Sequence, residues 1–206
     1  GEHAIKLAKE DNLIIGIDPS EDMLKIASQK IINNQLENLI QLKNDYASNF
    51  VLDKKADFAI MMFAVIGYHN SNDEILNCLK NIRKNLNIGS TLMFDFWYGP
   101  AVLTNNPSDK IKTIDTDNNK TLRLTKPVHK HFNHIVEVNF ETFHINNNTI
   151  LDHSNELHSM RYFFPQEILF YLENSGFELI ELSEFPSLDK KLSTNSWNAL
   201  CVARAK

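Results

Sequence analysis

The chain has 206 residues, of which 43% are hydrophobic and 23% are charged, and this length suffices for one domain with a substantial core. The net charge is −5 without a basic run, so the composition indicates no nucleic-acid partner. No apolar run approaches the ~20 residues of a membrane span, and the start lacks the features of a signal peptide. Two distant cysteines in apolar surroundings, Cys78 and Cys201, favour core thiols over a disulfide or a metal site. We therefore expect a cytoplasmic protein.

Helix-like and strand-like segments alternate over the first 97 residues. Helical spacing of apolar residues marks 2–9, 19–31 and 71–86, and buried-strand patterns mark 12–18, 39–45, 56–68 and 90–97. Ser20 is the expected N-cap of the second helix, and Ser71 or Asn72 that of the third. Residues 87–89 are expected to form a turn. This alternation predicts an α/β fold with a parallel sheet.

A different pattern follows from about Lys110 to Phe164. Apolar residues recur with period two in segments 121–128, 134–145 and 149–163, which polar turns separate. We expect antiparallel strands that lie on one side of the main sheet. A last helix over 165–177, closed by Gly176, and two strands over 178–185 and 196–205 complete the chain.

Two of the expected strands end in an acid. In open α/β sheets, ligands bind at the carboxyl ends of the strands. A carboxylate such as Asp18 can accept two hydrogen bonds from the vicinal diol of a ribose, and Asp45 can accept one from an exocyclic amine. Met23 and Tyr46 can enclose a flat ring, and the small apolar residues 64–67 leave room for an aliphatic arm with a sulfonium. The alternatives are a turn residue for Asp18 and a core residue for Met23.

Four segments carry a resemblance to a known family: GEHAIKLA (1–8), IIGIDPSEDML (14–24), LKNDYASNF (42–50) and NIRKNLNIGSTLMFDFW (81–97). They are similar to the motifs of the class I S-adenosylmethionine-dependent methyltransferases, and the resemblance covers essentially the whole chain. It implies that Gly1 ends a glycine-rich motif, that Asp18 binds the ribose hydroxyls and that Asp45 contacts the adenine amine. Asn87-Ile88 stands where the family usually has Pro-Gly.

The resemblance implies a Rossmann-like, doubly wound sheet with an added antiparallel β-subdomain, all in a single domain over 1–206. Residues 1–100 would bind the cofactor, 110–164 would cover the acceptor site, and 165–206 would hold the last helix and strands. The implied cofactor is S-adenosylmethionine, and S-adenosylhomocysteine is its product. The residues expected to bind it are Gly1, Asp18, Pro19, Met23, Asp45, Tyr46 and Phe63.

Two further segments, MMFAVIGYHN (61–70) and FDFWYGP (94–100), look most like those of sugar amine methyltransferases of antibiotic pathways. The resemblance implies that Tyr68 contacts or deprotonates the acceptor. We expect Tyr68 and His69 to be the catalytic residues: the imidazole of His69 has a pKa range suited to a base, whereas Tyr68 fits the orientation of the acceptor better.

Other residues are candidates for contact with the acceptor. Trp97 and Tyr98 follow a strand end and can form a wall of the pocket, although Trp97 can equally pack under the added strands. Arg161 and His158 can reach the acceptor from the last added strand, but for both of them the pattern favours a solvated strand face. His129 and His131 share a face if their segment is a strand, but no third ligand follows at a reliable spacing, so we expect no metal site.

Two other functions remain open. A nicotinamide-dependent oxidoreductase also has an acid after its second strand, and a non-catalytic domain can retain the fold. The strand and glycine loop that would precede Gly1 are absent, so we expect a fragment of a longer polypeptide; 206 residues alone would bind the cofactor badly. The sequence leaves open the small-molecule acceptor, the choice of nitrogen or oxygen, and the oligomeric state, for which a homodimer is compatible.

Overall fold

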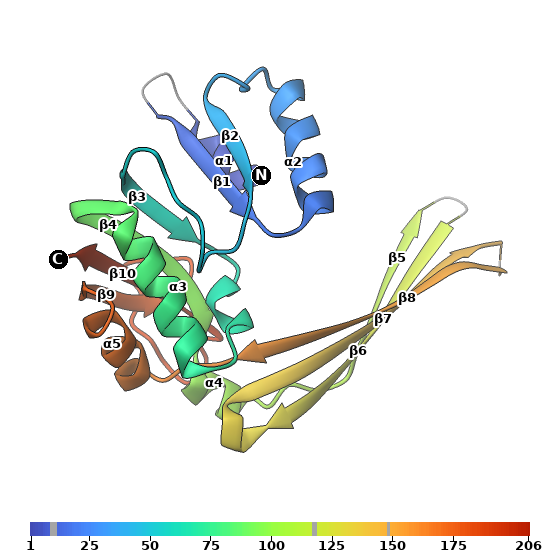
Figure 1. Ribbon diagram of the computed structural model, residues 1–206. Coiled ribbons are helices and arrows are strands. Elements are labelled where there is room, and N and C mark those ends of the chain that lie inside the picture. The colour runs from blue at the N-terminus through green and yellow to red at the C-terminus, as the bar shows by residue number, and fades with distance from the viewer. Residues whose placement is uncertain (9–11, 117–118, 148) are drawn as a thin grey trace.

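The computed structural model describes residues 1–8, 12–116, 119–147 and 149–206 (Figure 1). Helices and strands alternate in its first half, as predicted for an α/β fold. The elements are α1 (Glu2–Leu7), β1 (Ile14–Asp18), α2 (Glu21–Asn33), β2 (Ile40–Asn44), β3 (Ala56–Met61), the 3-10 helix η1 (Val65–Tyr68), α3 (Asn72–Lys84) and β4 (Leu86–Trp97). The prediction of the fold class is confirmed.

In the part of the chain that the structure describes, the strands of this half belong to two sheets. β1 and β2 form a parallel pair, and β3, β4, β10 (Asn198–Ala205) and β9 (Phe177–Glu184) form a second sheet in that order. β3 runs parallel to β4, whereas β10 is antiparallel to both of its neighbours. The arrowheads of β1 and β3 point to the same side in Figure 1, and Ile17 of β1 packs against the core of the larger sheet. The carboxyl ends of β1 and β3 therefore face one region.

Serine caps begin the two longer helices. The Ser20 hydroxyl accepts the backbone N–H of Met23, and the Ser71 hydroxyl accepts that of Glu74, whose side chain completes a capping box. Ser71 rather than Asn72 is thus the cap of α3. None of the helices in the described ranges is both long and apolar enough to span a membrane.

The strand predicted over 56–68 is too long. β3 ends at Met61, because Phe63 and Ala64 have positive φ angles of 68° and 55°, which no strand accommodates, and η1 follows them. The turn predicted over 87–89 is also wrong, since these residues belong to β4. Gly89 has a φ of 84° there, and the register between β3 and β4 shifts nearby, so the irregularity is absorbed within the strand.

The last predicted helix ends earlier than expected. α5 (Pro165–Glu173) has Asn174 as its C-cap, and Gly176, with a φ of 82°, lies two residues beyond that cap. Gly176 therefore forms the turn into β9 instead of closing the helix itself, because the chain needs a left-handed residue at that turn.

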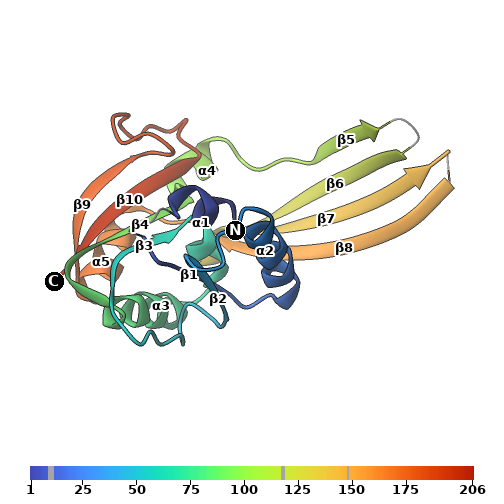
Figure 2. The same cartoon turned by 90° about the horizontal axis from the view of Figure 1, so that it is seen from above.

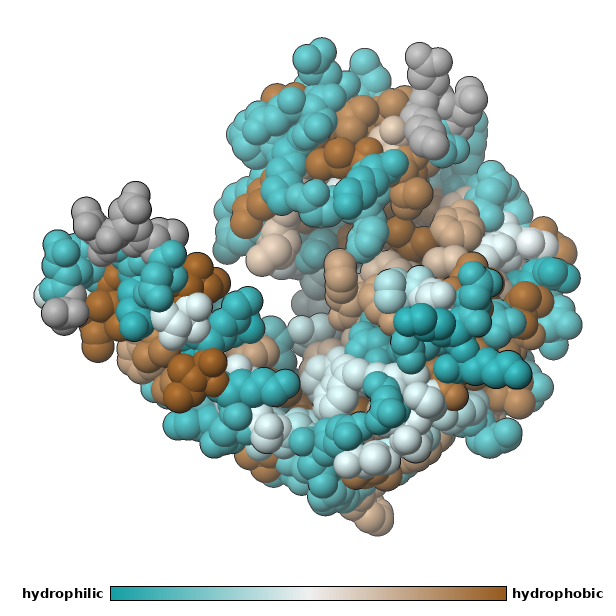
Figure 3. All heavy atoms as spheres, turned by 180° about the vertical axis from the view of Figure 1, so that it is seen from behind, coloured by the Kyte–Doolittle hydropathy of each residue, from teal (hydrophilic) through white to brown (hydrophobic). Residues whose placement is uncertain are grey.

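The period-two region forms a separate antiparallel sheet, which we call the arm: β5 (Lys110–Thr116), β6 (Asn119–Lys130), β7 (Ile135–Asn146) and β8 (Thr149–Arg161). The arm projects away from the larger sheet instead of lying on it, which corrects the prediction (Figures 1 and 2). A period of two shows which residues share a face, but it does not say what that face covers. The space-filling view shows an open hollow between the arm and the unit formed by α1, β1, α2 and β2 (Figure 3).

A small buried cluster holds the root of the arm. Val136 and Val138 of β7 pack with Tyr162 and with Val102 of α4 (Gly99–Thr104), the helix that follows β4. All four side chains are almost fully buried. The root is therefore tied to the end of β4, whereas the far end of the arm extends into solvent.

Both cysteines lie in the main core, where each is free and 0% exposed. Cys78 faces the sheet from α3, and Cys201 lies in the middle of β10. Burial raises the pKa of the Cys78 thiol to about 12 and also raises that of Cys201. The prediction of core thiols is confirmed.

We expect neither thiol to react with Ellman's reagent in the native protein at about pH 8, because a buried thiol with a raised pKa is neither ionised nor accessible. Denaturation in guanidinium chloride should release both thiols, Cys78 and Cys201, and serves as the control. The absorbance of the released thiolate measures the count. A thiol that reacts rapidly without denaturant would contradict this burial.

Candidate cofactor and acceptor site

Asp18 lies at the carboxyl end of β1, opposite Asn44 at the end of β2. Its Oδ1 atom accepts the backbone N–H of Ser20 at 2.8 Å, so the turn into α2 orients the half-buried carboxylate. The side-chain amide of Asn44 donates to the carbonyl of Pro19 at 3.4 Å, which joins the two strand ends. Only one oxygen of Asp18 is used within the described ranges, and the other is available to bind hydroxyl groups.

The loop after β2 presents an acid and an aromatic ring. The Oδ1 atom of Asp45 accepts the backbone N–H of Tyr46 at 2.8 Å. Tyr46 is 61% exposed, and Met23, in the first turn of α2, is 56% exposed. Both side chains thus offer apolar surface next to the strand ends, as a site for a planar ring requires.

A left-handed turn at Phe63 and Ala64 follows β3, and such a conformation costs about 1–3 kcal/mol for each residue. The carboxylate of Asp95, which is 0% exposed, stabilises this turn from β4. Its Oδ2 atom accepts the backbone N–H of Ala64 at 3.0 Å and the side-chain amide of Asn198 at 2.7 Å. Its Oδ1 atom is buried without a partner in the described part of the chain.

The sequence did not single out Asp95, because one acid inside an apolar strand has no spacing signal. Strained backbone that several contacts hold in place is concentrated at functional sites. The turn therefore marks the end of β3 as part of the candidate site.

Helix α1 lies beside this turn. The ring of His3 contacts the ring of Phe63 at a centroid distance of 5.2 Å, although Phe63 remains 69% exposed. Gly1, the N-cap of α1, packs on α2 so closely that a Cβ atom there would lie 3.2 Å from the Cβ of Ala27. Two of the expected cofactor residues therefore lie at α1: Gly1 as its N-cap and Phe63 in contact with its residue His3.

Tyr68 ends η1, and its hydroxyl lies 2.8 Å from the Nδ1 atom of His158 on the arm. The Nε2 atom of His158 lies 3.2 Å from the Oε2 atom of Glu156. Burial and, second, the carboxylate of Glu156 raise the pKa of Tyr68. The sequence analysis considered His158 separately and missed Glu156, because 90 residues separate Tyr68 from its partner on the arm.

His69 follows directly after η1. Burial lowers the pKa of its imidazole, and the nearby carboxylate of Glu74 opposes this shift. The ring is therefore neutral near pH 7, which is the form that can accept a proton. The catalytic role of His69 stays a prediction.

Trp97 and Tyr98 lie where β4 meets the arm. The ring of Trp97 contacts that of Trp197 edge-on at 5.6 Å and packs against the cluster at the root of the arm. Tyr98 is the N-cap of α4, and its backbone forms a bridge with that of Phe163. This packing favours the alternative in which Trp97 supports the added strands.

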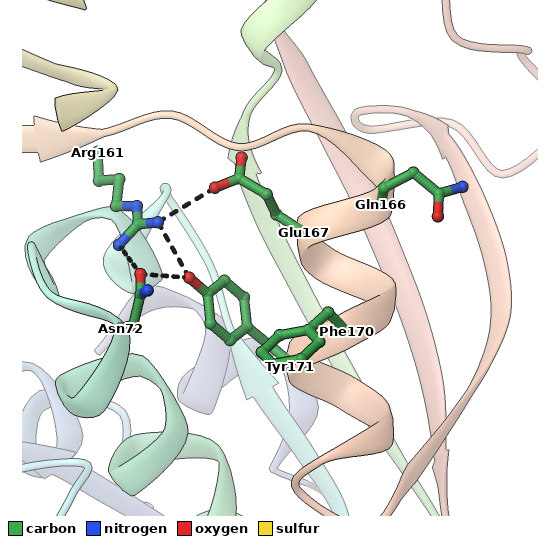
Figure 4. A pocket seen from close by; sticks show the side chains of 6 residues that line it. All are labelled: Asn72, Arg161, Gln166, Glu167, Phe170 and Tyr171. Atoms are coloured by element: carbon green, nitrogen blue, oxygen red, sulfur yellow. Dashed lines mark hydrogen bonds and ion pairs between the residues drawn. The ribbon is translucent and has the colours of Figure 1, made fainter. Parts of the chain in front are cut away.

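Arg161 is buried, with only 7% of its surface exposed, so the favoured prediction of a solvated strand face is wrong for this residue. β8 runs from the arm into the core, and this carries its last residue inward. The guanidinium donates to Asn72 at 2.9 Å, Glu167 at 3.1 Å and Tyr171 at 3.0 Å (Figure 4). A contact of Arg161 with an acceptor stays a prediction.

A hollow of about 350 Å³ opens beside these groups. It is lined by Asn72, Arg161, Gln166, Glu167, Phe170 and Tyr171 (Figure 4). Arg161 is the one member of this lining that the sequence analysis assigned to the site. The expected cofactor residues at the strand ends do not line this hollow.

The histidines of the arm pair with neighbours. His129 and His131 stack with ring centroids 3.7 Å apart, and the Nε2 atom of His129 lies 3.1 Å from the hydroxyl of Tyr162. Among the residues that the structure describes, no three His, Cys, Asp or Glu side chains converge as a metal site requires.

Comparisons with known proteins agree with this arrangement. Residues 1–89, which include α1 to α3 and the strand-end acids, match the family model described as "Methyltransferase domain". The protein YqeM of Bacillus subtilis (strain 168) is 24% identical over 179 residues, which make up 87% of this chain and 70% of YqeM.

Solved structures share the fold over nearly the whole chain. An S-adenosylmethionine-dependent methyltransferase from Clostridium acetobutylicum ATCC 824 has a TM-score of 0.79 at 17% identity, with 94% of this chain and 75% of that chain covered. The sugar N-methyltransferase KedS8 from Streptoalloteichus sp ATCC 53650 has a TM-score of 0.74 at 14% identity, with 93% and 70% covered. At these identities the likeness shows the fold.

Residues 1–89 therefore match a methyltransferase domain, and the chain has the fold of S-adenosylmethionine-dependent methyltransferases. Both findings support S-adenosylmethionine as the cofactor. They favour a methyltransferase over a nicotinamide-dependent oxidoreductase.

The buried carboxylate of Asp95 provides a test of the turn. Asp95→Ala leaves the N–H of Ala64 and the amide of Asn198 unpaired, and we expect the free energy of unfolding to fall by about 1–3 kcal/mol. Asp95→Asn keeps an acceptor oxygen, and we expect a smaller loss. Urea denaturation followed by circular dichroism measures both variants. If Asp95→Ala is as stable as the wild type, the carboxylate does not hold the turn.

Proposed function

We propose that the protein binds S-adenosylmethionine at the carboxyl ends of β1, β2 and β3 and transfers its methyl group to a small molecule. Asp18 would bind the ribose hydroxyls, and Asp45 the adenine amine. Met23 and Tyr46 would contact the adenine ring from either side, and Phe63 would border the same region. Gly1 and Pro19 complete the proposed cofactor set, Gly1 through the start of α1 and Pro19 through the turn after Asp18.

The position and the hydrogen bonding of the Asp18 carboxylate are the main support for this proposal. A carboxylate at the end of a parallel strand is oriented by one backbone N–H, and its second oxygen has no partner among the residues that the structure describes. Such a group is suited to a vicinal diol, because both hydroxyls can donate to it. The match of residues 1–89 to a methyltransferase domain is consistent with this role.

The bound cofactor supplies an electrophilic methyl group, so the chemical demands on the protein are modest. The protein has to align the acceptor, exclude water and accept one proton. Tyr68, the last residue of η1, and His69, the next residue, are the proposed groups for the last task. Trp97, Tyr98 and Arg161 remain candidates for contact with the acceptor.

An amino sugar is the acceptor that we favour, with transfer to its nitrogen. KedS8, whose fold this chain shares over 93% of its length, is a sugar N-methyltransferase. Transfer to an oxygen of another small molecule is the alternative, because fold alone does not determine the acceptor. We further propose a cytoplasmic location, with which the two free thiols agree.

Titration with S-adenosylhomocysteine in a calorimeter tests the cofactor site. We expect Asp18→Ala to weaken binding about 10- to 100-fold, since hydrogen bonds to a charged group are lost. Asp22→Ala is the matched control: Asp22 is an exposed aspartate in the first turn of α2 that pairs with Lys25, and we expect no change.

The outcomes separate the competing functions. If the wild type does not bind S-adenosylhomocysteine, whether tested as these 206 residues or as any longer product of its gene, the proposed function fails and a non-catalytic domain becomes the better account. If Asp18→Ala binds as tightly as the wild type, the cofactor lies elsewhere. Where binding is found, incubation with S-adenosylmethionine and a panel of amino sugars, followed by mass spectrometry, identifies the methylated product.

A further inference from the structure

We propose that Glu156 and His158 of the arm, together with Tyr68, form a proton-accepting chain for the methyl acceptor. The proposal rests on the proposed function and adds two residues to it. Tyr68 would touch the acceptor, whereas His158 and Glu156 would act through Tyr68.

The distances define the direction of the hydrogen bonds. Glu156 is a carboxylate and can only accept, so the contact of 3.2 Å requires a proton on the Nε2 atom of His158. A neutral imidazole then has a bare Nδ1 atom, which accepts the hydroxyl proton of Tyr68 at 2.8 Å. No donor from the described ranges of the chain contacts the lone pairs of the Tyr68 oxygen, so they can accept a hydrogen bond from a ligand. The raised pKa of Tyr68 agrees with a hydroxyl that keeps its proton at rest.

Neighbouring contacts hold the arm and η1 in this register. The side-chain amide of Asn70 donates to the carbonyl of Ser159 at 3.1 Å, and the hydroxyl of Ser159 donates to Asn70 in return. The ring of His158 also packs edge-on against Phe140 of β7 at 5.2 Å. Its side chain is 29% exposed, so it is restrained yet not sealed from the surface.

Tyr68 itself is placed for contact with a ligand. It ends η1, which begins directly after the left-handed turn held by Asp95, and half of its surface is exposed. β8 packs against η1, so the arm reaches the protein body next to the carboxyl end of β3. The chain of hydrogen bonds therefore leads from the end of β3 to the arm.

The proposed proton step is balanced. A neutral amine that gains a methyl group carries one positive charge and has to lose one proton. That proton passes to the oxygen of Tyr68 while the hydroxyl proton of Tyr68 passes to the Nδ1 atom of His158. The acceptor and Tyr68 end neutral, and His158 ends as an imidazolium whose positive charge faces the carboxylate of Glu156.

Nitrogen-15 NMR of the ring of His158 tests the arrangement without an acceptor, and His158→Gln assigns its signals. We expect the Nε2–H tautomer in the neutral wild type. Tyr68→Phe should shift the Nδ1 resonance, and Glu156→Ala should mix the two tautomers. Glu181→Ala, which changes an exposed glutamate on β9, is the control and should change neither. An Nδ1–H tautomer, or signals that neither variant alters, would overturn the proposal.

Methyl transfer to the amino sugar panel tests the chemical role. We expect Tyr68→Phe to lower kcat about 100-fold or more, and His158→Gln to lower it less, while the affinity for S-adenosylhomocysteine stays unchanged. An unchanged kcat in Tyr68→Phe overturns the proton chain but leaves the proposed function standing. If the wild type methylates no member of the panel, the proposed acceptor is wrong. The catalytic role of Tyr68, His158 and Glu156 is then overturned as well, whichever tautomer the NMR spectra show for His158.

Discussion

The hydrogen bond from the Ala64 N–H to the buried carboxylate of Asp95 is the contact on which the candidate site depends. After β3 the backbone changes from an extended to a left-handed conformation at Phe63 and Ala64. Neither residue type favours a positive φ angle. A carboxylate on the neighbouring strand offsets this strain, and Asn198 on β10 fixes that carboxylate from the other side. Three strands of one sheet thus hold the turn.

This turn sets the positions of groups that the proposed chemistry needs. It exposes Phe63 beside α1, and it directs the chain into η1, where Tyr68 meets the arm. Asp18 reaches the same side of the molecule from the smaller sheet. The proposed site therefore combines groups from three sheets. The smaller sheet supplies the carboxylate of Asp18, the larger sheet the strained turn after β3, and the arm His158.

Local features of the sequence were sufficient for much of the fold. Ser20 preceded a stripe of apolar residues and was correctly expected to cap a helix, and Asp18 was expected at a strand end because a buried run stopped there. Features that depend on distant partners were not accessible. The role of Asp95 can be predicted only if the backbone conformation at Ala64 is known. The contact of Tyr68 with His158 cannot be predicted either, because the alternating pattern of the arm strands does not show where the arm points. Short-range patterns predict elements, whereas contacts between elements depend on the whole fold.

The central claim is that the cofactor binds at the strand ends of the smaller sheet and beside the turn after β3. A crystal structure of the protein with S-adenosylhomocysteine tests it most directly. The account predicts ribose hydroxyls within hydrogen-bonding distance of the Asp18 carboxylate, with the adenine near Asp45. Electron density for the ligand in the hollow beside Arg161, or anywhere without contact to Asp18, would contradict the account.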